Sequence, residues 1–435
     1  MNASINPFAR VAKPAEEVRN LEEPQNFAGF KNLDEDVRED GEDSQLSTPF
    51  AVNKTELSRM RRSFRDPLFR KASAATLFAA SVALGVMMPS SFLVQTSGPT
   101  LDVNSTIDNQ SLVQVSGVPS YPTSTKLLMT TVSAWGNADG GVNGAQAVTA
   151  LFSSGQELLP VRAVYQENVT AKEVNAENQQ LMTFSQDSAS LLAFEMAGYD
   201  VSMDIKISQI FPDRPSGRVL QVGDIFRAIK LPGMDEFTEV KSHYQMSQLI
   251  DKTDPGTEIT VRVERSGELV EESFQTVPYP ADATGWVHPG SLLGVAITVE
   301  NVKLPAEVKY LVEGIGGPSA GSMFTLGIYD QLTPGDLAGE KTIAGTGTVA
   351  WDGDIGPIGG IRHKLSGARS AGATDFLAPA LNCGETTGYE PAGLKIWAVR
   401  NTFEALDAVK AIATGDTSEL QSCADVVAKT PKDSE

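Results

Sequence analysis

Basic side chains, cysteine and histidine are all scarce in this sequence of 435 residues. Lysine and arginine number 35 against 55 aspartates and glutamates, which gives a net charge of −20. Binding to a phosphate backbone requires clustered positive charge, so this composition argues against a nucleic-acid partner. The nucleotide-binding pattern GxxxxGK[ST] does not occur, so no ATP site is predicted, and no other motif indicates a cofactor.

The two cysteines, Cys383 and Cys423, both lie in the C-terminal part of the chain. Neither has the spacing of a metal ligand, and no metal site is expected. Two cysteines alone do not fix a redox compartment. If this part of the chain is exported, a single disulfide that closes the tail onto the preceding domain becomes plausible, and two free thiols are the alternative.

The N-terminal region predicts a membrane anchor. Residues 1–58 are rich in Glu, Asp, Pro and Asn and lack a hydrophobic period, which predicts a disordered acidic tail in the cytoplasm. Residues 59–71 form a basic juxtamembrane segment, and residues 72–94 carry no charge, so they form the predicted transmembrane helix. The basic flank keeps the N-terminus in the cytoplasm, so the sequence predicts a single-pass protein of the cell membrane with an extracytoplasmic bulk. A cleaved signal peptide and a buried soluble helix are the alternatives.

The chain beyond this segment divides by its hydrophobic pattern. Residues 102–198 predict strands followed by helices, with a capping box at Thr170 and Glu173. In residues 199–278, an alternating strand, the turn Gly223-Asp224-Ile225, a helix and another strand resemble a PDZ domain. The Gly-Leu-Gly-Phe loop typical of those domains is not recognisable. PDZ domains bind an extended peptide at a sheet edge, and a spacer role is the alternative.

Residues 285–413 alternate predicted strands and helices, and residues 414–435 form a polar tail expected to be loose. The strands are expected over 294–299, 308–315, 342–351, 375–378 and 394–399, and the helices over 319–332, 361–372 and 402–412. This pattern predicts an α+β domain of ordinary size.

A serine in a turn of small residues is the first candidate site in this domain. Ser319 follows Gly316, Gly317 and Pro318 and precedes Ala320, at the expected start of a helix. Free backbone N–H groups at such a position can stabilise an oxyanion during acyl transfer. A simple helix cap is the alternative interpretation.

Lys364 is the second candidate, because it follows the apolar, glycine-rich run Gly356–Ile361. A buried lysine has a lowered pKa and can accept a proton from serine, whereas a solvated lysine cannot. The neighbouring His363 is expected on the surface. No sequence motif supports the alternative of a triad that combines Ser319 with His288 and either Asp330 or Asp352.

Two stretches carry a resemblance to a known family. GGPSAG, over 316–321, and AGTGTVAWDGDIGPIGGIRHKLSGARSAGATDFLAPALN, over 344–382, resemble the proteolytic domain of Lon-type serine peptidases. The resemblance implies that Ser319 is the nucleophile and Lys364 its general base. With the predicted anchor and the PDZ-like unit, residues 70–425 resemble the bacterial membrane-anchored PDZ–Lon-like serine peptidases.

That resemblance implies a serine endopeptidase, held in the lipid bilayer by its anchor, that cleaves extracytoplasmic polypeptides. By analogy it also implies a ring-shaped homo-oligomer. Two departures stand out: the missing ATP-binding motif implies cleavage of flexible or unfolded substrates without ATP, and Thr346-Gly347-Thr348 replaces the common Thr-Gly-Glu. A non-catalytic PDZ-type scaffold that binds exported proteins is the alternative function.

Overall fold

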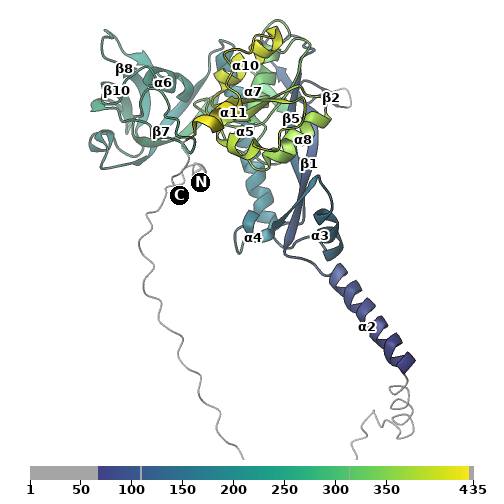
Figure 1. Ribbon diagram of the computed structural model, residues 1–435. Helices are drawn as coiled ribbons and strands as arrows, with labels where there is room; N and C mark the ends of the chain where they lie inside the picture. Colours follow the sequence, from purple (N-terminus) through teal and green to yellow (C-terminus); the bar gives the residue numbers. More distant parts are fainter. Residues whose placement is uncertain (1–66, 108–109, 313, 431–435) are drawn as a thin grey trace, which may run out of the picture. The chain divides into compact units, whose positions relative to one another are not determined.

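The computed structural model describes residues 67–107, 110–312 and 314–430 (Figure 1). The chain divides into two compact units, Met1–Val86 and Met87–Glu435. The predictions for residues 1–58, and for most of 59–71, lie outside the described residues.

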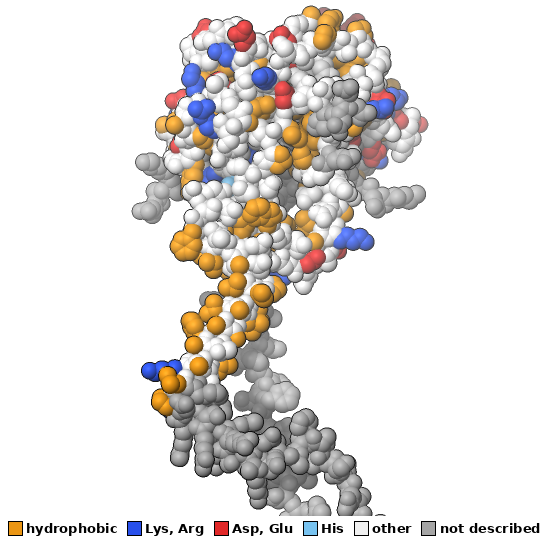
Figure 2. Space-filling view, turned by 90° about the vertical axis from the view of Figure 1, so that its right-hand side faces the viewer, with side chains coloured by type: hydrophobic (Ala, Val, Ile, Leu, Met, Phe, Trp, Pro, Cys, Tyr) orange, Lys and Arg blue, Asp and Glu red, His pale blue; other side chains and the backbone are white. Residues whose placement is uncertain are grey.

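Helix α2, Pro67–Met87, contains all of the described residues of the first unit. Many of its side chains are hydrophobic and exposed (Figure 2). Within the part of the chain that the structure describes, α2 included, no helix combines the length and the apolar character needed to cross a membrane. The helix predicted over residues 72–94 differs in its bounds: α2 ends at Met87, and Leu93 and Val94 lie buried in strand β1, Phe92–Asp102.

The main sheet has the strand order β18-β17-β14-β5-β1-β6. Its other strands are β5 (Lys126–Trp135), β6 (Gln156–Pro160), β14 (Thr342–Gly345), β17 (Asp375–Pro379) and β18 (Lys395–Val399). β1 pairs antiparallel with β5 and β6, whereas β5, β14, β17 and β18 run parallel to one another. The sequence assigns residues 102–198 and 285–413 to separate parts, but in the structure the two stretches share this sheet.

Helices pack on this sheet and on one another. They are α3 (Gly144–Leu151), α4 (Val161–Val164), α5 (Ala171–Met196), α7 (Gly321–Leu332), α8 (Ile361–Ser370), α9 (Cys383–Thr386), α10 (Thr402–Thr414) and α11 (Cys423–Lys429), with a 3₁₀ turn at Ala380–Asn382. The predicted capping box at Thr170 and Glu173 is confirmed at the start of α5. α5 and α7 lie side by side, and Leu192 and Phe324 are fully buried in the core that they share with the sheet.

A second sheet has the strand order β11-β10-β8-β7-β12. In the sequence, its strands come between the two stretches that build the first sheet. Its elements are β7 (Ser202–Ile210), a 3₁₀ turn at Pro215–Arg218, β8 (Ile225–Lys230), β9 (Thr238–Glu239), α6 (His243–Ile250), β10 (Glu258–Arg265), β11 (Glu268–Gln275) and β12 (Val295–Lys303). Apolar side chains alternate along β7 and β10, and Ile205, Phe226 and Val261 fill its core. The strand predicted over 294–299 therefore pairs with β7 and belongs to this sheet.

Three short ladders complete the described fold. They are β2 (Thr106–Ile107) with β3 (Gln110–Ser111), β4 (Val113–Ser116) with β13 (Glu307–Tyr310), and β15 (Thr348–Val349) with β16 (Ile355–Gly356). β13 precedes the loop that carries Ser319, and β15 lies beside the start of α7. The last two ladders therefore frame the candidate site.

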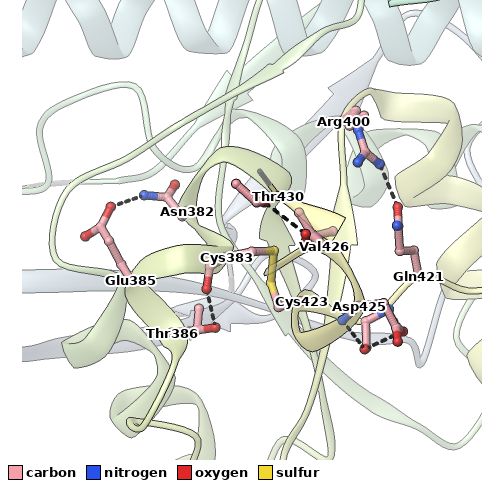
Figure 3. Close-up of a disulfide and its surroundings, with 11 residues drawn as sticks. Asn382, Cys383, Glu385, Thr386, Arg400, Gln421, Cys423, Asp425, Val426 and Thr430 are labelled. Atoms are coloured by element: carbon pink, nitrogen blue, oxygen red, sulfur yellow. Dashed lines mark hydrogen bonds between the residues drawn. A yellow bond between two sulfur atoms is a disulfide. The ribbon is translucent and has the colours of Figure 1, made fainter. Parts of the chain in front are cut away.

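The C-terminal segment is ordered by a disulfide. Cys383 in α9 and Cys423 at the start of α11 are bonded, with their Cα atoms 4.8 Å apart (Figure 3). Both cysteines are buried in a cluster with Ile361 and Leu365 of α8. The loose tail predicted for 414–435 therefore differs from the structure, in which residues 423–429 form a helix pinned to the domain.

Candidate active site

Lys364 lies in the first turn of α8, and its side chain points into the protein. It is 2% exposed. Its Nζ lies 2.9 Å from Ser319 Oγ and donates a hydrogen bond of 2.7 Å to the Thr130 carbonyl oxygen of β5. Gly360 lets the start of α8 lie close to β5. Its φ is +70°, and a Cβ there would lie 2.8 Å from a methyl group of Val132 in β5.

Burial changes the acidity of Lys364. Its removal from water penalises the charged ammonium and lowers the pKa of Lys364 from 10.5 to about 7. A substantial fraction of the amine is therefore neutral near pH 7. A neutral amine has a free electron pair that can accept a proton, and the Ser319 hydroxyl lies within hydrogen-bond distance of it.

The loop before α7 holds Ser319 through its backbone. The Ser319 carbonyl oxygen accepts hydrogen bonds from Gly347 N–H and Thr346 Oγ, each 2.9 Å long. The carbonyl oxygen of Pro318 accepts from Ser185 Oγ of α5 at 3.0 Å. Two carbonyl groups at the nucleophile are thus fixed by groups from distant segments of the chain.

These contacts narrow the choice of oxyanion donors expected over Gly316–Ala320. Pro318 has no N–H, and the N–H of Gly317 donates to the carbonyl oxygen of Asn178 at 2.9 Å. The N–H groups of Ser319 and Ala320 lie next to the hydroxyl, just before the first residue of α7, so they are the donors best placed for an oxyanion.

The histidines are placed differently from the expectations. His363 is buried, at 8% exposure, and its Nε2 lies 3.2 Å from a Glu157 carboxylate oxygen of β6, so the predicted surface position is wrong. His288 lies near the carboxylates of Asp251 and Asp354, at 3.6 and 3.9 Å. The group hydrogen-bonded to Ser319 Oγ is an amine, as the glycine-rich run before Lys364 indicates.

Of the two carboxylates considered for a triad, Asp352 lies 3.9 Å from His243 Nδ1. Asp330 accepts from the Thr123 hydroxyl and from the Leu337 N–H, so it holds the segment after α7 in place. Among the described residues, no group of three or more His, Cys, Asp and Glu side chains is arranged to hold a metal ion.

Reasoning from the sequence missed three residues that surround the pair: Thr130, Asn178 and Ser185. Each contributes a contact across a long stretch of chain, and Lys364 and Thr130 are 234 residues apart. The capping box identified α5 as a helix, but nothing local to its sequence indicates that Ser185 faces the Ser319 loop.

Comparison with known proteins identifies the class. Residues 313–398 match the family model of the Lon protease (S16) C-terminal proteolytic domain. The chain therefore carries a Lon-type proteolytic domain, a finding that supports serine peptidase activity.

Two curated relatives are proteins called Lon protease 2. The one from Syntrophobacter fumaroxidans is 36% identical over 66 residues, which cover 15% of this chain and 8% of the relative. The one from Bacillus subtilis is 32% identical over 95 residues, which cover 22% and 17%. The chain thus spans only a small part of the length of these relatives.

Two PDZ domains from SdrC-like proteins are structural neighbours. The domain from Listeria monocytogenes has a TM-score of 0.17 and 16% identity and covers 21% of this chain and 85% of its own. The domain from Listeria innocua has a TM-score of 0.16 and 19% identity and covers 20% and 91%.

Proposed function

We propose that this protein is a serine endopeptidase with Ser319 as nucleophile and Lys364 as general base. The observation that carries the proposal is the buried Lys364 amine 2.9 Å from Ser319 Oγ, within reach for proton transfer. The lowered pKa of Lys364 supports it, because a base must be unprotonated near the working pH. The match to the Lon proteolytic domain supports the same class of reaction.

The geometry supports the following course of reaction. Ser319 passes its hydroxyl proton to Lys364 Nζ while Oγ attacks the carbonyl carbon of the scissile peptide bond. The N–H groups of Ser319 and Ala320 stabilise the oxyanion that forms. The C–N bond then breaks, and the Lys364 ammonium returns its proton to the departing amine, which leaves an ester on Ser319.

Water completes the reaction. It gives a proton to Lys364 as its oxygen attacks the ester, and the second tetrahedral intermediate collapses to release the acid and to reprotonate Ser319 Oγ. Throughout the cycle the Thr130 carbonyl oxygen accepts an N–H of Lys364, which keeps the amine directed toward the serine in both protonation states.

The substrates we propose are flexible or unfolded polypeptides, cleaved without ATP. The absence of the GxxxxGK[ST] pattern from the sequence supports the second part of this proposal. β12 is the last strand in the order of the second sheet, and its outer edge is where we expect an extended peptide to add as a further strand.

We also propose that the proteolytic domain works in an oxidising compartment, outside the cytoplasm. The disulfide between Cys383 and Cys423 supports this location, because such bonds are rare where thiols are kept reduced. Alkylation of protein taken directly from cells tests it. We expect both thiols to be modified only after reduction, and modification before reduction would reject the location.

Cleavage of a quenched-fluorescent casein without ATP tests the proposed activity. We expect cleavage by the full chain and none by the variants Ser319→Ala and Lys364→Met. Ser366→Ala and Lys341→Met, which change exposed residues of the same types, serve as matched controls and should cleave like the unaltered protein. Undiminished cleavage by purified Ser319→Ala would reject the assignment.

A further inference from the structure

Ser185 differs from its neighbours in helix α5. The hydroxyls of Ser188 and Ser190 reach carbonyl oxygens of their own helix, at Phe184 and Gln186, as serine in a helix commonly does. They also have partners outside it, the Val349 carbonyl oxygen for Ser188 and the Tyr310 hydroxyl for Ser190. Ser185 is fully buried and donates outward, to the carbonyl oxygen of Pro318. That carbonyl belongs to the peptide group whose N–H is that of Ser319.

The bond from Ser185 to the Pro318 oxygen helps to fix the direction of the Ser319 N–H, and the Gly321 N–H donates to the same oxygen at the longer distance of 3.3 Å. In a trans peptide group the C=O and the N–H point to opposite sides, and the described residues contain no cis peptide bond. Because the Pro318 oxygen points toward α5, the Ser319 N–H points away from α5. The same reasoning applies one residue later: Thr346 and Gly347 hold the Ser319 oxygen, so the Ala320 N–H points away from them.

Further hydrogen bonds join α5 to the segment that leads into α7. Tyr310 at the end of β13 donates from its hydroxyl to the Gln186 carbonyl oxygen of α5, and Gly317 donates to Asn178 of the same helix. A Cβ on Gly321 would lie 2.7 Å from Ser185 Oγ, so glycine is what allows the start of α7 to approach the hydroxyl. α5 therefore contacts the loop before α7 at several points. At Pro318 the contact comes from a side chain, that of Ser185, which can be changed by substitution.

We propose that Ser185 is a positioning residue that aims the Ser319 N–H at the oxyanion of the tetrahedral intermediate. This inference rests on the proposed role of Ser319 as nucleophile. The negative charge on the substrate oxygen develops only as the tetrahedral intermediate forms. A misdirected N–H therefore reduces the stabilisation of the transition state more than the binding of the substrate. The loss is therefore seen in kcat rather than in KM.

Peptide cleavage by the full chain tests this assignment. We expect Ser185→Ala to lower kcat by about 10- to 100-fold, the range for a small displacement of a catalytic group, with KM changed by less than about twofold. Ser185→Cys keeps the shape of the side chain with a somewhat larger atom and a weak S–H donor, so its kcat should fall between those of Ser185→Ala and the unaltered protein. Ser216→Ala removes a fully buried hydroxyl that donates to the Gly294 carbonyl oxygen, away from the Ser319 loop, and should keep kcat within about threefold.

A peptide boronate provides a readout that packing alone does not change. Boron adds to Ser319 Oγ and places an oxygen where the oxyanion forms. We expect the Ki of the boronate to rise in Ser185→Ala by the same factor by which kcat/KM falls, and to stay unchanged in Ser216→Ala. Thermal unfolding of all variants shows whether the two alanine substitutions destabilise the protein equally.

The outcomes separate this inference from the proposed function. If the unaltered protein cleaves, Ser319→Ala does not, and Ser185→Ala matches the unaltered kcat and Ki, the positioning role is wrong and the nucleophile stands. If Ser185→Ala does not fold, an unaltered kcat in Ser185→Cys overturns the role. Cleavage that survives Ser319→Ala overturns both.

Discussion

Lys364 Nζ lies within hydrogen-bond distance of Ser319 Oγ, although 45 residues separate the two in the sequence. The amine is held by the Thr130 carbonyl oxygen on β5, so three segments of the chain meet at one buried nitrogen. A lysine in this position acts as a base only while it is neutral, and several expectations follow from that requirement.

Lys364→Arg should abolish cleavage. A guanidinium group keeps its proton in proteins, so it cannot accept one from Ser319. We expect kcat/KM to fall by at least about 10³-fold, as measured with a quenched-fluorescent peptide, in line with the loss of a general base. Lys341→Arg is the matched control. Substantial activity in Lys364→Arg would show that another group takes the proton.

The rate should rise with pH through the pKa of Lys364. Burial lowers this pKa to about 7, so the base is mostly protonated below pH 6 and mostly neutral above pH 8. We expect kcat/KM to increase about tenfold per pH unit below pH 7 and to level off above it. His363→Gln should leave the midpoint unchanged, because His363 faces Glu157. A profile that is flat between pH 5.5 and 8.5 would contradict the assignment.

Lys364→Met should raise stability while it removes activity. The buried amine has a lower pKa in the folded chain than its ordinary value of 10.5, so the folded state binds this proton more weakly than the unfolded state. The resulting penalty is full at or below pH 7 and vanishes as the pH rises toward 10.5.

An uncharged methionine escapes this penalty, and we expect a gain of about 1–4 kcal/mol in the free energy of unfolding at pH 7. Urea unfolding at pH 7 and pH 10 measures it. A gain equal at both pH values, or a loss at pH 7, would contradict a desolvated lysine.

The disulfide should stabilise the proteolytic domain. Cys383 and Cys423 are 40 residues apart in sequence, and the bond limits the freedom of the unfolded chain. Replacing both cysteines with alanine should lower the free energy of unfolding by about 2–4 kcal/mol. The unaltered protein should approach the same value in dithiothreitol, while the double variant should not respond to it. A reductant effect of equal size on both proteins would rule out the disulfide as its source.

The sequence singled out two residues whose side chains the structure places 2.9 Å apart. Ser319 in its turn of small residues and Lys364 after a glycine-rich run are recognisable because short-range constraints, such as the positive φ of Gly360, require these residue types. The capping box of α5 and the strands β17 and β18 follow from local patterns in the same way.

Local sequence patterns could not predict which strands pair when they are far apart in the sequence. β5 lies next to β14 in the main sheet although residues from 136 to 341 separate them, and no periodicity within either strand encodes that neighbour. For this reason residues 102–198 seemed a separate part, and Thr130 and Ser185 went unnoticed. The end of α2 at Met87 has a similar cause, because Leu93 and Val94, which follow it, are buried in the sheet.

The reaction of the full chain with a fluorophosphonate probe, followed by mass spectrometry of its peptides, tests the central claim most directly. The account predicts one adduct, on Ser319, that forms faster as the pH rises through 7 and at least about 10²-fold more slowly in Lys364→Met. An adduct on another serine, or equal labelling of Ser319 with and without Lys364, would contradict it.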